Sequence, residues 1–516
     1  MNEYGQIVFV PVIPRQMPEG GNGERMFIDK GRDHTGQPIS NNTLLTDFYE
    51  LTMANGYFES GMLDQIGYFD MFFRNIPDGG GFAIMAGLEP LINYMKDLRY
   101  TDEDIEFLRS KGCFSEGFLE YLRNFKFECD VWAVPEGTPV FPYEPLITIR
   151  GPLIQAQLLE TFLLLCINHQ TLIATKTNRI VRAAKGRAIM EFGTRRAQGA
   201  SAAVLGARAA YIGGAAGTAC TIADQIYGIP AMGTMAHSWV QSFDSEYEAF
   251  SRFADLFPDN CVLLVDTYDV LKSGLPNAIR VFKEKNPSKK GIRIDSGDIT
   301  YLSKKCRAIL DEEGLTDCSI VASNSFDEYI VRGVVNEGAC VDSFGVGERL
   351  ITAKSQPVFG GVYKLAAVEK DGRIIPKIKV SENIEKITNP GYKKLYRIFD
   401  KETQKALGDV VALADDVVPE SDPFEIFDPK NVWKRKIIHD YEIRELQVQI
   451  FDKGECVYES PTLDEIKALC AKNIDLLWDE IKRFENPHTY IVDLSKRLWA
   501  LKDRLLNEHS KFREEN

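Results

Sequence analysis

The segment Arg293-Ile-Asp295-Ser-Gly-Asp places a cation and an acid two residues apart on an expected strand. Because successive side chains of a strand point to opposite faces, Arg293 and Asp295 should share one side of the sheet. At that spacing they could hold a pyrophosphate and ribose hydroxyls together. An ordinary Arg–Asp ion pair filling the core of a barrel is an equal alternative on this motif alone.

Two further guanidinium groups stand at another strand end, in Glu191-Phe-Gly-Thr-Arg-Arg196. A cation at such a position suits a carboxylate or phosphate ligand. Arg195 is the better candidate for ligand binding. For Arg196 we favour a structural role, in an ion-pair network with Glu191 or other acids.

His237 lies four residues after Gly233, in Gly-Thr-Met-Ala-His. An accessible imidazole there could act as a base, as an anion contact or as a nucleophile toward ATP. A lone histidine is more often structural. The remaining histidines are interpreted as surface or packing residues: His34, His169, His439, His488 and His509.

Small residues in Gly213-Gly-Ala-Ala-Gly-Thr-Ala and in Gly345-Val-Gly347 would let backbone N–H groups approach phosphate oxygens. Asp266 and Asp269 supply acids at a third strand end, where hydrated Mg²⁺ could arrive with substrate phosphates, near Asp266 and Asp295. The sequence has no H-x-x-H, H-E-x-x-H or paired-cysteine motif, so we expect no tightly held transition metal.

These segments recur as short β-type runs with polar tips, separated by mostly helical sequence, between residues 187 and 360. Seven such units favour an irregular, TIM-like α/β barrel whose site gathers at the carboxyl ends of its strands. A doubly wound open sheet is the alternative. The tips are AIMEFGTRR, AYIGGAAGT, PAMGTMAHS, VLLVDTYD, GIRIDSGD, IVASNSFDE and DSFGVGERL.

The flanking sequence predicts further units around this barrel. An N-terminal arm is expected over 1–40, an α+β domain over 41–150, the barrel over 151–360, a β-rich segment completing the α+β domain over 361–460, and a helical tail over 461–516. Helices are expected after Asp47, over 82–98 and over 152–185, the last with Leu158, Leu159, Phe162 and Leu165 on its apolar face. A hairpin should turn at Asp371-Gly372.

Composition narrows the class of protein. A net charge of −14 disfavours nucleic-acid or anionic-membrane partners. No apolar run approaches the roughly 20 residues that a membrane-spanning helix needs, and the N-terminus lacks signal-peptide features. Ten scattered cysteines suggest buried thiols in a reducing compartment, so a cytoplasmic location is expected.

Five ordered motifs together resemble the nicotinate phosphoribosyltransferase family: Leu44–Tyr49, Glu191–Arg196, Gly233–His237, Ile292–Asp298 and Phe344–Gly347. The resemblance covers about 41 to 380, and also the tail. It implies a type II phosphoribosyltransferase fold and homodimers with shared active sites. It also implies ATP-stimulated transfer from phosphoribosyl pyrophosphate to nicotinate, the first step of NAD salvage from nicotinate, with Mg²⁺ as cofactor and ATP as co-substrate.

The resemblance also implies roles for individual residues. Phe192 and a Tyr49 donated by the partner subunit would sandwich the pyridine ring. Arg293 and Thr234 look like contacts to the carboxylate of nicotinate. Arg195 and Asp295 look like contacts to the phosphoribosyl donor, Gly345 and Gly347 like its 5′-phosphate cradle, and His237 like the family's phosphorylatable histidine.

Two departures from relatives matter. Glu348 stands where some relatives have threonine beside the phosphate, so only the backbone is carried over there. The 213–219 loop lacks the aspartate that nicotinamide-using relatives carry, which suits nicotinate. Alternatives are a nicotinamide or quinolinate phosphoribosyltransferase, a barrel aldolase or isomerase acting on sugar phosphates, and a non-catalytic nucleotide-binding barrel.

Overall fold

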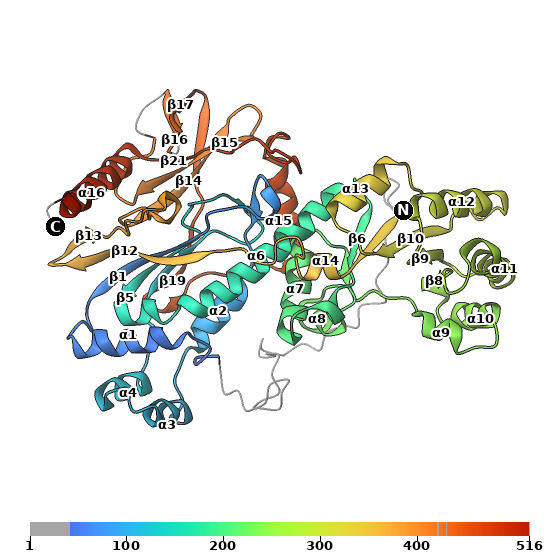
Figure 1. The fold of residues 1–516 in the computed structure, drawn as a ribbon, viewed down its shortest axis with the longest axis horizontal. Helices are drawn as coiled ribbons and strands as arrows, with labels where there is room; N and C mark the ends of the chain where they lie inside the picture. The colour runs from blue at the N-terminus through green and yellow to red at the C-terminus, as the bar shows by residue number, and fades with distance from the viewer. Residues whose placement is uncertain (1–41, 420–422, 430, 515–516) are drawn as a thin grey trace.

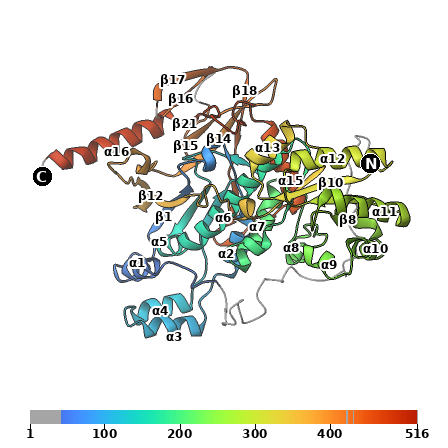
Figure 2. The ribbon, with the colours of Figure 1, turned by 45° about the vertical axis from the view of Figure 1, so that its right-hand side comes forward.

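The computed structural model describes residues 42–419, 423–429 and 431–514. The expected arm over 1–40 lies outside the described residues. Two β-sheets dominate the fold, and the long helix α6 (Glu160–Ala183) runs between them in both ribbon views (Figures 1 and 2). The active residues proposed from sequence lie mainly at one of these sheets.

The first sheet has the strand order β13-β12-β1-β5-β3-β19-β20 and mixes chain segments that are far apart in sequence. Its third strand in that order, β1, pairs antiparallel with β5 and with β12. The hairpin between β12 and β13 turns at Asp371 and Gly372, both with positive φ, so the prediction from sequence is confirmed. The bounds are β1 Ile66–Phe72, β3 Asp130–Ala133, β5 Ile147–Pro152, β12 Val362–Lys370, β13 Arg373–Pro376, β19 Val448–Asp452 and β20 Glu455–Cys456.

The second sheet is parallel, with the order β7-β6-β11-β10-β9-β8. Its bounds are β6 Ala188–Glu191, β7 Gly217–Thr218, β8 Cys261–Leu264, β9 Lys290–Ile294, β10 Ser319–Asn324 and β11 Ser343–Val346. A parallel bridge from Thr218 to Ala231 adds the remaining predicted unit beside β7. The first strand, β6, therefore pairs with both the second and the last, as barrel order requires.

The barrel is not closed within the described residues, because no strand pairing joins Ala231 to β8. The expectation of a TIM-like barrel is thus corrected to a curled parallel half-barrel. Two helices occupy the chain between these edges, α9 (His237–Gln241) and α10 (Glu246–Leu256). The doubly wound alternative is wrong, since its strand order would not place first and last strands side by side.

Helices cover the half-barrel and follow its strands. Every residue of strands β8 and β11 is buried, as expected for strands enclosed on both faces. The covering helices are α7 Ala200–Ile212, α8 Thr221–Tyr227, α11 Leu275–Lys285, α12 Ile299–Glu312, α13 Glu328–Asn336 and α14 Glu348–Ile351. Their N-termini therefore lie at the same edge as the polar strand tips.

The N-terminal helices differ in part from expectation. Helix α1 (Phe48–Glu59) is confirmed, but the helix expected over 82–98 begins only at Leu88, after a short strand β2 (Ala83–Ile84) and Gly87 at φ 101°. Helices α3 (Asp102–Ser110) and α4 (Glu116–Arg123) were not predicted. Thr101 and Asp104 form the capping box that starts α3.

The expected helix over 152–185 is two helices, α5 (Leu153–Gln157) and α6. Leu165, which we placed on the buried face, is 49% exposed, and Phe162 is half-buried against Tyr94. The stretch Leu153–Ala183 is long and apolar enough to cross a membrane by composition alone. More than half of the most apolar part of this stretch is nevertheless buried inside the fold, as in the core helix of a globular protein.

The C-terminal region departs from the expected helical tail. Strands β14 (Lys393–Asp400), β15 (Ala406–Leu413) and β18 (Tyr441–Glu445) form a separate four-stranded sheet with β21 (Val492–Leu494), which interrupts that tail between two helices. Strand β21 pairs parallel with β15. The remaining elements are β4 Pro139–Val140, which pairs with β2, β16 Phe424–Asp428, β17 Asn431–Ile438, α2 Leu88–Asp97, α15 Leu463–Asp475 and α16 Lys496–Glu514.

The cysteines agree with the expectation of free thiols. All ten are free and lie among the described residues. Most are buried, whereas Cys113 is exposed and Cys340 and Cys456 are half-buried. Burial raises the pKa of the Cys306 and Cys318 thiols to about 12, so both remain protonated and behave as small apolar side chains.

Candidate active site

Arg293 on β9 is the centre of a polar cluster at the strand ends of the half-barrel. Its Nε donates to Ser323 Oγ of β10 at 2.7 Å, and its Nη2 donates to Asp295 Oδ1 at 3.0 Å. Nη1 lies 3.3 Å from Thr234 Oγ1 and 3.2 Å from the carbonyl oxygen of Met235. The prediction that Arg293 and Asp295 share one side is confirmed, and the guanidinium joins three segments.

Asp295 is held as a carboxylate by its surroundings. Burial alone would raise its pKa, but hydrogen bonds from Ser323 and Arg293, together with the charge of Arg293, hold the pKa below its usual range. Ser323 Oγ donates to the same Oδ1 that Arg293 contacts. The arrangement keeps the negative charge of Asp295 fixed beside the positive charge of Arg293.

His237 begins α9 and keeps one ring nitrogen available. Its Nδ1 is 3.1 Å from Thr267 Oγ1, in the loop after β8. Its Nε2 is 3.9 Å from Asp295 Oδ2, beyond hydrogen-bond distance, and the side chain is 41% exposed. An imidazole that is anchored on one side and accessible on the other can accept a group from a bound ligand.

Phe192 follows β6, and its ring packs against the neighbouring strand β11. Its backbone N donates to Val346 O at 2.8 Å, and its ring occupies the space above Gly345, where an added Cβ would come within 2.4 Å of ring Cδ2. The Arg293 guanidinium carbon is 5.9 Å from the ring centroid. An aromatic face with a guanidinium beside it suits a planar ring that bears a carboxylate, and we call this surface of Phe192 and Arg293 the ring slot.

Gly345 is thus part of β11 and makes room for Phe192, whereas Gly347 lies just before α14. Of the two, Gly347 has the position of a backbone donor near a helix start. The carboxylate of Glu348 pairs with Lys354, with 2.6 Å between Glu348 Oε1 and Lys354 Nζ, and this contact lowers the pKa of Glu348. Its negative charge is therefore partly neutralised next to the glycine pair.

Glu191 does not pair with the arginines that follow it. Its buried carboxylate accepts from Thr218 Oγ1 at 2.6 Å and from the backbone N of Gly193. Burial raises its pKa. Arg195 and Arg196 are exposed, and neither forms a close ion pair within the described residues. The interaction expected between Arg196 and Glu191 is therefore not formed, although the charge of Arg196 contributes to lowering the pKa of Glu348. Both guanidinium groups remain available to an anion.

Asp266 lies under Asp295 and has a vacant acceptor. Its Oδ2 accepts from Asp295 N at 3.1 Å and from Ser296 Oγ at 2.6 Å, while its buried Oδ1 has no hydrogen-bond partner. Asp269 instead caps the following helical turn through the backbone N of Leu271 and Lys272. In the described part of the chain, no three His, Cys, Asp or Glu side chains are grouped to hold a metal ion by themselves.

Tyr49 lies far from this cluster within one chain. It is on α1, at the opposite end of the molecule from β8–β10 in Figure 1. The residue is 45% exposed, and partial burial together with the nearby carboxylate of Glu160 raises the pKa of its hydroxyl. The other residues named from sequence gather at the half-barrel, so Tyr49 is the exception.

A cavity of about 330 Å³ opens beside the cluster at the ends of β9 and β10. Its walls include Asp298, Asn324, Ser325 and Arg349. Sequence reasoning singled out none of these, nor Ser323 and Thr267, which contact Arg293 and His237. The sequence signal that could have identified these residues is their position in strand-tip segments that were already recognised as polar.

Comparisons with known proteins agree with this geometry. Three family models match: the nicotinate phosphoribosyltransferase N-terminal domain over residues 44–168, the nicotinate phosphoribosyltransferase family over 187–408, and its C-terminal domain over 392–502. The chain is 43% identical to nicotinate phosphoribosyltransferase of Bacillus subtilis, covering 90% of this chain and 95% of that protein. It is 31% identical to the Homo sapiens protein of that name, covering 90% and 96%.

The crystal structure of human nicotinic acid phosphoribosyltransferase is similar, with a TM-score of 0.78 and 30% identity. The match covers 90% of this chain and 100% of the human chain. A nicotinate-nucleotide pyrophosphorylase from Pyrococcus furiosus, at a TM-score of 0.64 and 23% identity, shares the fold.

Proposed function

We propose that this chain, which belongs to the nicotinate phosphoribosyltransferase family, transfers the phosphoribosyl group of phosphoribosyl pyrophosphate to nicotinate with stimulation by ATP. The products of the transfer are nicotinate mononucleotide and pyrophosphate, and the reaction begins NAD salvage from nicotinate. The observation that carries the proposal is the ring slot, in which the guanidinium carbon of Arg293 lies beside Phe192, 5.9 Å from the centroid of its ring.

The slot would orient nicotinate for attack. The pyridine ring stacks on Phe192, while Arg293 and Thr234 receive the carboxylate through N–H and O–H donors. The ring nitrogen then attacks C1 of the ribose as pyrophosphate leaves, so no protein nucleophile toward the sugar is needed. Positioning of the two reactants supplies much of the rate.

The donor would lie across the neighbouring strand ends. Asp295 faces the ribose hydroxyls, Arg195 is exposed and free to meet the pyrophosphate, and Gly347 offers backbone N–H to the 5′-phosphate. As pyrophosphate leaves, negative charge grows on it while the anomeric carbon becomes oxocarbenium-like. Fixed cations at this edge stabilise that separation of charge.

Asp266 and Asp295 fit a Mg²⁺ ion that arrives with the substrate phosphates. The buried, unpartnered Oδ1 of Asp266 is an acceptor of the kind this ion prefers, and two carboxylates with phosphate oxygens suit its ligand demand. When bound, Mg²⁺ neutralises developing charge on the leaving pyrophosphate. Asp266 also fixes Asp295 through the backbone N of that residue.

His237 would couple ATP to the transfer through a phosphohistidine. Thr267 holds Nδ1, which leaves Nε2 as the accessible nucleophile. The imidazole makes no contact required for attack at the ribose. Its phosphorylation therefore serves energy coupling, and basal transfer should survive its loss.

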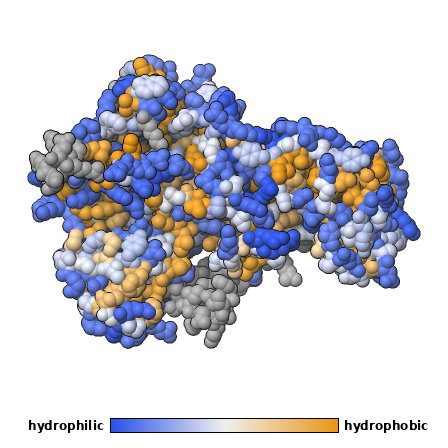
Figure 3. All heavy atoms as spheres, viewed as in Figure 1, coloured by the Kyte–Doolittle hydropathy of each residue, from blue (hydrophilic) through white to orange (hydrophobic). Residues whose placement is uncertain are grey.

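A homodimer with shared sites accounts for Tyr49. The exposed side chains Leu45, Phe48 and Met53 surround it on and beside α1, and Figure 3 shows apolar surface in that part of the molecule. Burial of this patch against a second copy would bring Tyr49 to the partner's Phe192 slot. The free thiols also support a cytoplasmic location.

The decisive assay is nicotinate-dependent pyrophosphate release from phosphoribosyl pyrophosphate, with and without ATP. Nicotinate should be used much faster than nicotinamide, because the 213–219 loop offers no acid to accept from an amide. Equal or faster use of nicotinamide would overturn the substrate assignment. Absence of pyrophosphate release with any pyridine substrate would favour a non-catalytic barrel.

A further inference from the structure

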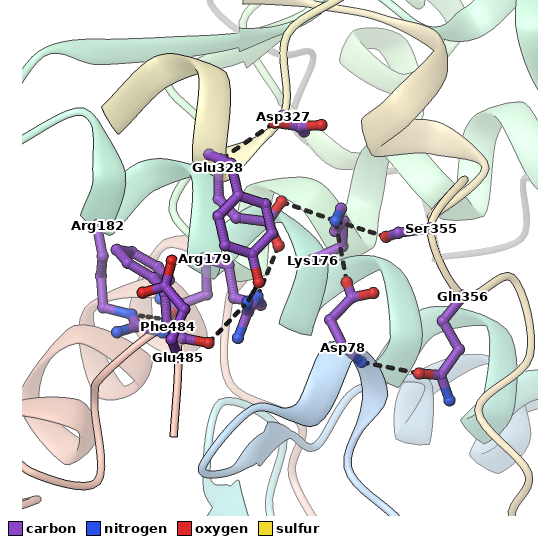
Figure 4. Close-up of polar contacts among 12 residues, drawn as sticks. Asp78, Lys176, Arg179, Arg182, Asp327, Glu328, Ser355, Gln356, Phe484 and Glu485 are labelled. Carbon is purple, nitrogen blue, oxygen red and sulfur yellow. Dashed lines mark hydrogen bonds and ion pairs between the residues drawn. The ribbon is translucent and has the colours of Figure 1, made fainter. Parts of the chain in front are cut away.

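The ammonium of Lys176, on α6, is buried among oxygens from three separate segments (Figure 4). Nζ lies 2.7 Å from Glu328 Oε2, 2.8 Å from Ser355 Oγ and 2.9 Å from Asp78 Oδ2. Asp78 belongs to the turn at 77–79, Glu328 is the first residue of α13, and Ser355 follows α14. One cation thus joins the N-terminal α+β unit to two parts of the half-barrel.

The surrounding charges are balanced. Arg179, one helical turn after Lys176, places Nε 2.8 Å from the other oxygen of Glu328, so two cations face two carboxylates. Lys176 and Arg179 are each 3% exposed, and Glu328 is fully buried. Removing one member leaves an uncompensated charge in a region with little water, and the segments would separate to relieve it.

The two half-barrel segments that contact Lys176, at Glu328 and at Ser355, are close in sequence to residues of the candidate site. Glu328 follows Ser323 by one short turn, and Ser323 Oγ is the common partner of Arg293 and Asp295. On the other side, Gln356 Oε1 accepts from the backbone N of Asp78 at 2.8 Å. The segment 347–356, which begins at Gly347, is therefore held at its far end by the same turn.

A second ion pair ties the two segments to each other. Arg349 Nη1 donates to Asp327 Oδ2, and Oδ1 of Asp327 caps α13 by accepting from Tyr329 N at 3.1 Å and Ile330 N at 2.9 Å. The start of α13 and the residues after Gly347 are therefore joined into one unit. Lys176 connects that unit to the rest of the chain.

We propose that Lys176 is a positioning residue for phosphoribosyl transfer. By holding the 324–328 turn and the 347–356 segment against the N-terminal unit, it aligns the backbone that receives the phosphoribosyl donor. This inference rests on the proposed function. The effect should fall on the donor more than on nicotinate, because Gly347, proposed to contact the donor, lies in the 347–356 segment itself. Phe192 and Arg293, proposed to contact nicotinate, extend from β6 and β9 outside both segments.

The test compares Lys176→Met with Lys393→Met. Lys393 is an equally buried lysine, 2.7 Å from Asp70, but its pair joins β14 to β1 and touches neither segment. Lys176→Met should raise the KM for phosphoribosyl pyrophosphate about tenfold and the KM for nicotinate by less than about threefold. Lys393→Met should lower the melting temperature and leave both KM values unchanged.

Ser355→Ala keeps every charge and removes one contact of Lys176, so it remains informative if Lys176→Met does not fold. It should raise the KM for the donor by about threefold with an unchanged melting temperature. An unchanged donor KM in Ser355→Ala, or equal changes in both KM values in Lys176→Met, would overturn the inference. Inactivity of the wild-type protein would instead contradict the proposed function.

Discussion

The ring of Phe192 lies directly against Gly345, so closely that a Cβ on this glycine would stand 2.4 Å from ring Cδ2. The glycine lets an aromatic side chain from one strand cross the neighbouring strand and face Arg293. A glycine motif that resembles a phosphate cradle therefore has a second use, in shaping the slot for the pyridine ring.

Gly345→Ala should displace the Phe192 ring and raise the KM for nicotinate about tenfold, with a smaller change for phosphoribosyl pyrophosphate. Steady-state kinetics with each substrate varied in turn would show this. If Gly345 serves mainly as the phosphate cradle, the donor KM will rise instead. Gly333→Ala, within α13 where an added Cβ meets nothing within 4 Å, is the control and should leave both values unchanged.

His237→Ala should lose ATP stimulation and keep part of the basal transfer, because the imidazole contacts Thr267 and not the ring slot. Arg293→Ala should impair both, with a loss of about a hundredfold in kcat/KM, since it removes the cation that the carboxylate needs. The measurement is pyrophosphate release with and without ATP. Complete loss of basal transfer in a folded His237→Ala protein would contradict this division.

Labelling with ATP tests directly whether His237 becomes phosphorylated. The wild-type protein should acquire an acid-labile, base-stable phosphate, and His237→Ala should acquire none. Thr267→Val should label more weakly, because it removes the oxygen 3.1 Å from Nδ1 that orients the ring. Undiminished labelling of His237→Ala would place the phosphate on another residue.

Mixing two impaired variants, Tyr49→Ala and Arg293→Ala, tests the shared site. In a mixed dimer of Tyr49→Ala and Arg293→Ala subunits, one of the two sites receives intact Tyr49 and intact Arg293. With free subunit exchange, about a quarter of wild-type activity should return. The activity of each variant alone is the baseline. No recovery, despite exchange demonstrated by size-exclusion analysis of tagged subunits, would show that each site is built within one chain.

The buried Asp493 on β21 predicts a pH dependence of stability. Burial raises its pKa to about 8 in the folded chain. The unfolded carboxyl ionises near pH 4, so between about pH 4 and 8 the unfolded state binds fewer protons, and stability falls as pH rises. Asp493→Asn should therefore stabilise the protein at pH 8 and give little gain at pH 4.

Thermal unfolding of Asp493→Asn at both pH values, beside the exposed control Asp64→Asn, would measure the effect. Ionisation of Asp493 changes the free energy of unfolding by at most roughly 1.4 kcal/mol per unit of difference between its folded and unfolded pKa. Relaxation of the folded chain reduces this change. A gain of the same size at both pH values would show that protonation of Asp493 is not its origin.

Local sequence patterns predicted the features that depend on near neighbours. The turn at Asp371-Gly372 follows from two residues that accept positive φ, and α1 follows from its start signal. The common side of Arg293 and Asp295 follows from the two-residue period of a strand. The seven polar-tipped units likewise indicated a barrel-like strand order.

Other features depend on contacts that local patterns do not record. Leu165 fits the apolar face of its helix, yet it is 49% exposed, since no element of the described residues fully covers it. Val492 and its neighbours form β21 only because β15 offers an open edge. Closure of the barrel depends on whether two edges meet, and here no pairing joins them within the described residues.

The sequence by itself determined the family, the chemical types at the strand ends and the local geometry of the Arg293–Asp295 pair. Tertiary structure decided which distant groups meet them. Ser323 is 30 positions from Arg293, and Thr234 is 59 positions away, so their contacts exist only once the parallel strands align. It also decided that Glu191 turns to Thr218 rather than to Arg196, because a buried carboxylate takes the donors that folding brings within reach.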